Sequence, residues 1–239
     1  MSDRKIPIVW ITGASRGIGA AIAEAFGRGG AHVVLTGRNV SALRRNAEGI
    51  NRAGGNASVI KCDVRSSESV SRAQSLMVKN WGGVDVLVNN AAITYFKPFS
   101  RTTTQEYDRV MATNLRGAFL SIKSVLPGML KKKKGTIVNI VSVSATTTFL
   151  DSSVYSASKA GMLALSRGLR AEVRKKGIRI IDVLPGAVET KMWDRESLRK
   201  YGRRMMRPSD VADVVVSAFR LPDNVLTEEI IMRPIEGDL

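Results

Sequence analysis

The sequence predicts an α/β fold, in which a doubly wound, seven-stranded parallel sheet carries helices on both faces. Apolar runs of strand length alternate along the chain with longer segments of helical periodicity, which is the pattern of repeated βαβ units. A glycine-rich turn directly follows the first run. The chain has 239 residues, of which 44% are hydrophobic and 24% charged, and we expect a single domain over residues 1–239.

The strands are expected at residues 8–12, 32–36, 57–62, 84–89, 136–141, 179–184 and 229–233. Most are apolar at successive positions, as a sheet covered on both faces requires. Helices are expected to begin near Gly17, Ser41, Ser67, Thr104, Val154 and Ser209. Residues 191–207 fit neither pattern, so we expect them to form a substrate lid before the last helix.

The formal net charge of +16 admits nucleic acid, an anionic membrane surface or acidic small molecules as partners. Basic residues are spread along the whole chain, and the one dense run, at residues 131–134, precedes a glycine, as expected of a solvated helix-to-strand connection. We therefore expect no specific nucleic-acid partner.

Two residue types occur only once, as His32 and Cys62, so neither a metal site nor an internal disulfide is expected. No apolar run reaches the length of a membrane span, and the first strand begins too early for a leader peptide. We expect no membrane insertion and a cytoplasmic location.

The turn after the first strand reads Thr12-Gly13-Ala14-Ser15-Arg16-Gly17-Ile18-Gly19 and leads into a helix. Glycines permit positive φ and a close backbone approach, and a helix N-terminus favours a pyrophosphate. The spacing differs from the Gly-x-Gly-x-x-Gly pattern, and a tight connection without a ligand is the alternative. We assign dinucleotide contacts to Gly13, Ser15, Arg16, Gly17, Ile18 and Gly19.

The end of the second strand predicts which dinucleotide binds. An acidic residue there would select NAD, whereas arginine would accept the 2′-phosphate of NADP. The sequence places Arg38 at this point, and Arg16 can supply a second guanidinium, so we predict NADP(H) as the cofactor. The alternative is that Arg38 only caps an exposed turn.

Small and polar residues end the third and fourth strands. Asp63, followed by Val64, can accept a hydrogen bond from the adenine amino group, cap the next helix, or do both. Asn90 and Ala91 are suited to lining the cofactor groove.

Tyr155 and Lys159 lie four residues apart at the start of a predicted helix, so their side chains project from the same face. A free tyrosine has a pKa of about 10 and is a poor acid-base at neutral pH. A nearby ammonium favours the phenolate and lowers that pKa, which predicts proton transfer by Tyr155.

Taken together, the turn at 12–19, residues 89–92, Asn114, Ser142, the Tyr155–Lys159 pair and residues 185–190 closely resemble the short-chain dehydrogenase/reductase family. The resemblance covers essentially the whole chain. It implies a Rossmann-type doubly wound sheet with a nicotinamide cofactor across its switch point, and further cofactor contacts at Pro185, Gly186, Val188 and Thr190.

The resemblance also implies the roles of four catalytic residues. Tyr155 would be the general acid-base, and Lys159 would lower its pKa and contact the nicotinamide ribose. Ser142 would orient the substrate carbonyl, and Asn114 would hold a water for proton relay. The protein would then reduce a ketone or aldehyde with NADPH.

The sequence departs from the family pattern at two positions. Ala92 stands where a glycine is usual, and Val141 stands where a serine often precedes the catalytic one. Ser142 is chosen because it lies thirteen residues before Tyr155, which is the family interval. Ser144 would point to the same side of an extended strand and is the alternative.

Apolar residues in the lid and after the fourth strand predict the walls of a substrate pocket. We assign these walls to Met192 and Trp193 on one side and to Tyr95, with its neighbours Thr94 and Phe96, on the other. Packing against the last helix is the alternative for the lid. Two substrate classes fit the resemblance, 3-oxoacyl thioesters and pterin carbonyls of the sepiapterin type.

The family commonly forms tetramers through the helices that carry Asn114 and Tyr155, so we expect a homotetramer or a homodimer. A different class of protein, a non-catalytic nucleotide sensor or nucleic-acid-binding protein, would keep the fold and use its basic surface. The presence of all four catalytic residues argues against it.

Overall fold

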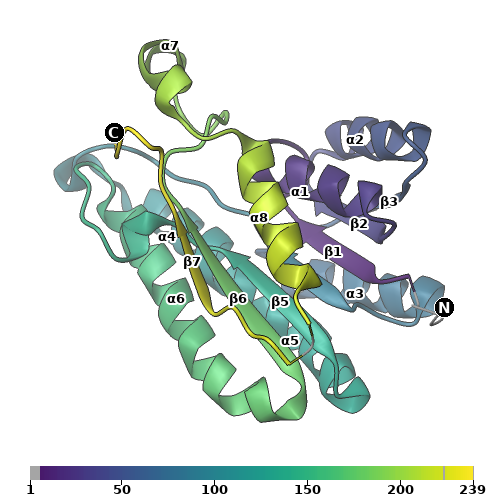
Figure 1. The fold of residues 1–239 in the computed structure, drawn as a ribbon. Helices are drawn as coiled ribbons and strands as arrows, with labels where there is room; N and C mark the ends of the chain where they lie inside the picture. Colours follow the sequence, from purple (N-terminus) through teal and green to yellow (C-terminus); the bar gives the residue numbers. More distant parts are fainter. Residues whose placement is uncertain (1–5, 223, 239) are drawn as a thin grey trace.

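A computed structural model describes residues 6–222 and 224–238 and forms a seven-stranded parallel sheet with the order β3-β2-β1-β4-β5-β6-β7 (Figure 1). The strands are β1 (Ile8–Thr12), β2 (His32–Gly37), β3 (Asn56–Lys61), β4 (Val86–Asn89), β5 (Gly135–Ile140), β6 (Ile178–Pro185) and β7 (Glu229–Met232). Each lies within two residues of its predicted position, so the predicted fold class is confirmed.

Helices cover both faces of the sheet (Figure 1). They are α1 (Gly17–Arg28), α2 (Val40–Arg52), α3 (Ser67–Trp81), α4 (Thr104–Met111), α5 (Gly117–Lys132), α6 (Ser153–Val173), α7 (Arg195–Tyr201) and α8 (Pro208–Arg220). Side chains of β1 alternate between two cores, because Val9 and Ile11 pack with α1, α2 and α8, whereas Ile8 and Trp10 pack with α3 and α5. This two-sided burial explains the continuous apolar strands.

The strand order reverses between β1 and β4, which are neighbours in the sheet. In open parallel sheets, ligands bind beside such a switch point, outside the carboxyl ends of the strands. The glycine-rich turn, Asn90, Ser142 and Pro185 all lie at the ends of strands on this edge. The fold therefore gathers the predicted site residues at one edge of the sheet.

The helix predicted to begin near Thr104 is interrupted. A wider π-helical turn, Ala112–Arg116, separates α4 from α5. α5 ends at Lys132, and Lys133 takes a left-handed conformation before β5, as expected of a helix-to-strand connection.

The predicted lid contains the short helix α7. Asp194 caps it, because its Oδ1 accepts a hydrogen bond from the backbone nitrogen of Ser197 at 2.8 Å. The lid returns to the body at Met206, which pairs with Val188 and packs against the core, next to the buried Met205. These two methionines anchor the lid, and the segment before them projects from the body (Figure 1).

Candidate active site

The glycine-rich turn joins β1 to α1 with very little space around it. Gly13 and Gly17 have φ values of 68° and 57°, a conformation that favours glycine. A Cβ on Gly13 would lie 2.8 Å from the Cα of Ala91, and one on Gly19 would lie 2.3 Å from Nδ2 of Asn90. The first turn of α1 carries no acidic residue, so its N-terminus suits an anion such as a pyrophosphate.

Two asparagines hold this turn in place. Nδ2 of Asn90 donates to the carbonyl oxygens of Thr12 and Gly13, at 2.9 and 3.1 Å. Nδ2 of Asn46, on α2, donates to the carbonyl oxygen of Ala14 at 3.0 Å. The structure thus places Asn90 under the turn, as a support for it. Asn46 could not be predicted from the sequence, because one asparagine in an amphipathic helix gives no signal.

The region after β2 and β3 carries several charged side chains. Arg16 and Arg38 are exposed and have no ion-pair partner among the described residues. Asp63 binds Arg65 with both oxygens, at 2.6 Å for the shortest contact. Hydrogen bonds from Arg65 lower the pKa of Asp63, and the charge of Arg38 lowers it further. Ser66 caps α3, so the helix-capping alternative for Asp63 was wrong.

The loop after β6 closes the crevice from the other side. The backbone nitrogen of Gly186 donates to the carbonyl oxygen of Met232 at 2.7 Å, which fixes the loop to the end of β7. A Cβ on Gly17 would lie 3.2 Å from Cγ2 of Thr190. The predicted cofactor residues of the glycine turn and of the 185–190 loop therefore meet.

Three of the four predicted catalytic residues lie together at the end of β5. Nζ of Lys159 donates to the carbonyl oxygen of Ile140 at 2.7 Å and lies 5.7 Å from the ring centre of Tyr155. The side chain of Ser142 lies close enough to the Tyr155 hydroxyl to lower its pKa. Ser142 and Lys159 are buried, and Tyr155 is partly buried.

Burial controls the protonation of this group. It raises the pKa of Tyr155 to about 12, against an opposing hydrogen bond from Ser142, and it lowers the pKa of Lys159 to about 7. Desolvation of the phenol dominates in this structure, and the lowering of the Tyr155 pKa by Lys159 stays a prediction. Tyr155 keeps its proton at neutral pH, whereas Lys159 titrates close to neutrality.

Ser142 and Ser144 do not lie on an extended strand, contrary to the sequence-based expectation. β5 ends at Ile140, and a 3₁₀ turn, Val143–Ala145, follows. The Ser142 hydroxyl accepts a hydrogen bond from the backbone nitrogen of Ser144 at 3.1 Å and donates to its hydroxyl at 3.2 Å. Ser142 is thus the N-cap of the turn and the serine that contacts Tyr155.

Asn114 lies in the π-helical turn, a feature often found at functional sites. Its Oδ1 accepts from the backbone nitrogen of Ile93, and its Nδ2 donates to the Ile93 carbonyl oxygen and to Oγ of Ser158, all at 2.9 to 3.0 Å. Ser158 donates to the carbonyl oxygen of Tyr155. Asn114 therefore ties the segment after β4 to α6, and both of its side-chain hydrogens are used in doing so.

Aromatic rings connect Tyr155 to the lid. The ring of Phe96 lies edge-on to Tyr155, with centres 6.2 Å apart, and is stacked on Trp193 at 5.2 Å. Nε1 of Trp193 donates to the carbonyl oxygen of Val188 at 3.1 Å, which orients the indole. Tyr95 and Met192 directly precede Phe96 and Trp193 in the sequence, and both are exposed.

The C-terminal tail, residues 233–238, joins the lid to the loop that follows Ser142. Arg204 of the lid pairs with Glu236, at 2.9 Å between Nε and Oε2. Nη2 of Arg233 donates to the hydroxyl of Thr147 at 3.0 Å, and its other nitrogen pairs with Asp238.

A buried polar network lies under α6. Nδ2 of Asn139 on β5 donates to Oδ1 of Asp182 on β6 at 2.9 Å, and Nδ2 of Asn89 on β4 donates to Oδ1 of Asn139 at 2.9 Å. Ser166 and Arg170 of α6 both donate to Asp182. Since Ile140 follows Asn139 directly, the network fixes the strand end whose carbonyl oxygen binds Lys159.

Residues 6–222 and 224–238 contain no cluster of His, Cys, Asp or Glu that could hold a metal ion. Within the same described residues, no helix is long and apolar enough to cross a membrane.

A dinucleotide-type glycine turn and a buried Ser–Tyr–Lys group at one edge of a doubly wound sheet define an oxidoreductase of the α/β class. The family model described as short chain dehydrogenase matches residues 7–200. The chain belongs to the short-chain dehydrogenase/reductase family, as the resemblance predicted.

Several relatives are similar over nearly the whole chain. A sepiapterin reductase from Chlorobaculum tepidum is 37% identical over 97% of this chain and 98% of its own. A glycine betaine reductase, ATRR, from Emericella nidulans is 36% identical over 94% of this chain, which matches 18% of that longer protein.

Solved structures agree with the fold. A metagenomic short-chain oxidoreductase in complex with NADP superposes with a TM-score of 0.85 at 34% identity, covering 95% of this chain and 96% of that one. An alcohol dehydrogenase from Thermococcus sibiricus, complexed with 5-hydroxy-NADP, gives a TM-score of 0.89 at 27% identity, over 98% and 99% of the two chains.

Proposed function

We propose that the protein is an NADPH-dependent reductase that converts a ketone or aldehyde to an alcohol. The observation that carries this proposal is the buried group of Ser142, Tyr155 and Lys159 beside the glycine-rich turn. When bound, the nicotinamide cofactor supplies the hydride. The protein orients the substrate and moves the proton.

Tyr155 is the general acid. Burial keeps its hydroxyl protonated at neutral pH, so the proton to be donated is present. Donation to the substrate oxygen requires a lower pKa, which a charged neighbour of the phenol supplies. Ser142 donates a hydrogen bond to the substrate oxygen, and Lys159 in its protonated form stabilises the phenolate that remains. Because both side-chain hydrogens of Asn114 are used, a relay water would donate to an oxygen atom, either Oδ1 of Asn114 or a carbonyl oxygen of the π-helical turn.

The exposed guanidiniums of Arg16 and Arg38 support NADP over NAD. Neither is neutralised by a carboxylate of the described residues, so both are free to bind a 2′-phosphate. The two NADP-type complexes among the structural relatives agree with this choice.

The proposed substrate is a 3-oxoacyl thioester or another small carbonyl compound. A pterin carbonyl of the sepiapterin type is the second candidate, favoured by the stacked Phe96 and Trp193 next to Tyr155 and by the similarity to a sepiapterin reductase. Flat aromatic side chains suit a flat, conjugated ring. Trp193→Ala should therefore raise the KM for sepiapterin more than that for an acetoacetyl thioester.

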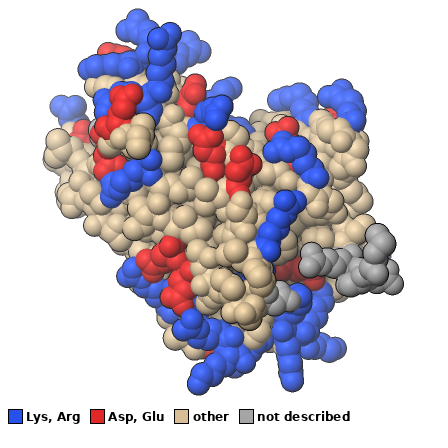
Figure 2. Space-filling model, in the orientation of Figure 1, with Lys and Arg blue, Asp and Glu red and all other residues tan. Residues whose placement is uncertain are grey.

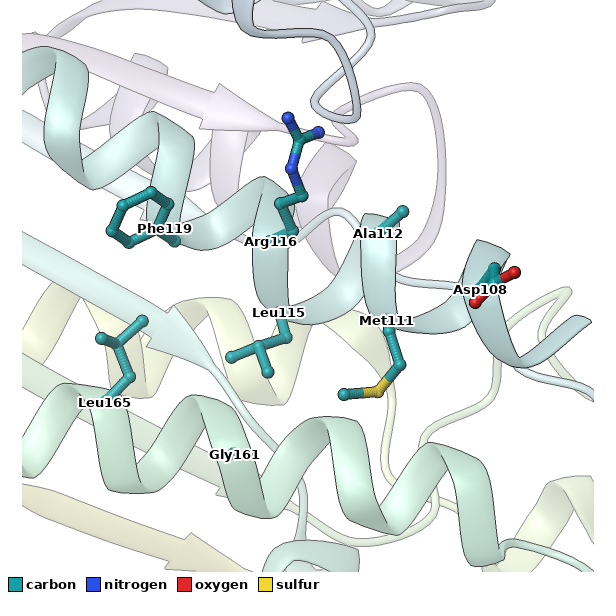
Figure 3. A pocket seen from close by; sticks show the side chains of 8 residues that line it. All are labelled: Asp108, Met111, Ala112, Leu115, Arg116, Phe119, Gly161 and Leu165. Atoms are coloured by element: carbon teal, nitrogen blue, oxygen red, sulfur yellow. The ribbon is translucent and has the colours of Figure 1, made fainter. Parts of the chain in front are cut away.

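We also propose a homotetramer or homodimer that uses the outer face of α4, α5 and α6. A groove of about 670 Å³ lies there, lined by Met111, Leu115, Phe119 and Leu165 among others (Figure 3). Phe119 is 43% exposed, and a pair of such grooves related by a two-fold axis would bury it. A monomer in sedimentation at micromolar concentration would overturn this assignment.

The first test is a fluorescence titration with NADPH and NADH, on the wild type and on Arg38→Ala. We expect tight NADPH binding that is lost in the variant, and weak NADH binding in both. Equal binding of the two cofactors would overturn the NADP assignment.

The second test is turnover of acetoacetyl thioester and sepiapterin with NADPH. Reduction of either one supports the reductase and selects the substrate class. Absence of all carbonyl turnover, together with salt-dependent DNA binding, would instead favour a non-catalytic protein that uses its basic surface.

A further inference from the structure

We propose that the lid carries a phosphate-binding site for the substrate, formed by Lys191, Arg195, Arg199 and Arg203, and that the substrate is a carbonyl thioester of coenzyme A. This inference rests on the proposed reductase function. It adds a site that lies outside the catalytic group.

The lid is a strongly basic segment of the chain. Residues 191–207 contain seven Lys or Arg residues and two Asp or Glu residues, a net charge of +5 out of the +16 of the whole chain. Figure 2 shows basic side chains gathered over the region where Figure 1 draws α7. One cluster of positive charge therefore lies on this projecting element.

The four basic residues of the proposed site recur at every fourth position. Arg195 and Arg199 lie on one face of α7, and Arg203 follows in the next 3₁₀ turn. All four are exposed, and none makes an ion pair or hydrogen bond with another described residue. The other lid arginines differ, because Arg204 pairs with Glu236 and Arg207 with Asp210.

This arrangement is unfavourable for the helix itself. Like charges four residues apart destabilise a helix, and α7 has only seven residues over which to offset that cost. A bound anion removes the repulsion, since phosphate oxygens accept charge-assisted hydrogen bonds from several guanidiniums at once.

Along the sequence, the four basic residues flank a residue of the predicted substrate pocket. Trp193 stands between Lys191 and Arg195, and it is stacked on Phe96, which contacts Tyr155. A substrate whose carbonyl lies at Tyr155 and whose chain passes Trp193 would continue along α7. Coenzyme A matches this path, because its reacting thioester and its phosphates lie at opposite ends of a long, flexible arm.

The test compares two thioesters with the same reacting group. Acetoacetyl-coenzyme A carries the phosphates, and acetoacetyl-N-acetylcysteamine lacks them. kcat/KM for both would be measured with NADPH on the wild type and on Arg195→Gln/Arg199→Gln/Arg203→Gln. The control is Lys131→Gln/Lys175→Gln/Lys176→Gln, which removes the same charge from exposed positions just before β5 and β6, at the opposite edge of the sheet.

We expect the lid variant to lose about tenfold more kcat/KM with the coenzyme A thioester than with the short thioester, through KM. Added salt should reduce the wild-type preference, because it screens exposed charges. The control variant should keep the preference. Equal losses with both thioesters, or a preference that survives in the lid variant, would overturn the site.

A binding measurement separates this proposal from the reductase assignment. Free coenzyme A would be titrated by calorimetry into NADPH-saturated protein, so that the cofactor site is blocked. Binding that is weakened in the lid variant supports the phosphate site even if neither thioester is reduced, in which case the thioester-reductase assignment alone fails. No binding to the wild type overturns the phosphate site.

Discussion

The carboxylate of Asp182 is completely buried and accepts hydrogen bonds from the hydroxyl of Ser166, at 2.5 and 2.7 Å to its two oxygens. One residue lies on β6 and the other on α6, the helix that carries Tyr155 and Lys159. Arg170 completes the contact as a buried counter-ion. The orientation of the catalytic helix on the sheet is therefore specified by polar contacts in addition to apolar packing.

Asp182→Asn should destabilise the fold strongly. The substitution keeps the size of the side chain but removes the one buried carboxylate that pairs with Arg170, leaving only the more distant Glu228 and Glu229 at 3.7 and 3.8 Å. Breaking a buried pair in this way costs about 3 to 5 kcal/mol. Urea unfolding measures this change. Glu24→Gln, which breaks the exposed pair with Arg28, is the control and should cost less than about 1 kcal/mol. Equal effects would show that Asp182 and Arg170 are not a coupled pair.

Lys159 should make stability increase with pH above neutrality. Its pKa is about 7 in the folded chain, against 10.5 for an unperturbed lysine side chain, so between these values the unfolded state binds more protons. The free energy of unfolding then rises with pH, by at most about 1.4 kcal/mol per unit from this group. Lys159→Met should flatten the curve between pH 7 and 9.5, whereas Lys131→Met, at an exposed site, should not. Parallel curves for the wild type and Lys159→Met would contradict the lowered pKa.

The two serines after β5 should differ in their effect on catalysis. Ser142 contacts Tyr155, so Ser142→Ala should lower kcat by about 10² to 10³, the usual loss for one oxyanion donor. Ser144→Ala leaves the Ser142 hydroxyl in place and should cost less than about tenfold. Steady-state kinetics on the best substrate of the carbonyl panel distinguishes the two. A larger loss for Ser144→Ala would move the catalytic role to that residue.

Gly13→Ala should weaken NADPH binding at least about tenfold. Residue 13 has a left-handed backbone conformation, which alanine disfavours, and the added methyl group would collide with the backbone of Ala91. Gly168→Ala is the matched control, since no neighbouring atom lies within 4 Å of its Cβ position in the middle of α6. It should bind NADPH normally and gain slightly in stability from the better helix propensity of alanine. Unchanged binding in Gly13→Ala would mean that the turn does not hold the cofactor.

The parts of the molecule that the sequence predicted well depend on short-range patterns. The strand with Val9 and Ile11 is apolar because both of its faces are buried, and this pattern can be recognised within a segment of five residues. The same holds for the Tyr155–Lys159 pair, whose spacing on a helix brings the two side chains together.

Other features depend on contacts between distant segments, which spacing does not encode. Phe96 and Trp193 stack only because the lid returns beside the segment after β4. Asp182 meets Arg170 only through the packing of α6 on the sheet. The π-helical turn around Asn114 has an ordinary helical sequence, so no local sequence pattern predicts it. In α7, by contrast, Asp194 three residues before Ser197 was a capping signal that could have been recognised.

The pairing of Arg204 with Glu236 and of Arg233 with Thr147 has a practical consequence for handling the protein. An affinity tag fused beyond Asp238 would follow directly on the segment whose contacts hold the lid against the loop after Ser142, and could disturb those contacts. β1 begins at the opposite edge of the sheet, so a tag placed ahead of it leaves the pocket clear. Kinetic constants for this enzyme are best compared between preparations that are tagged at the amino end.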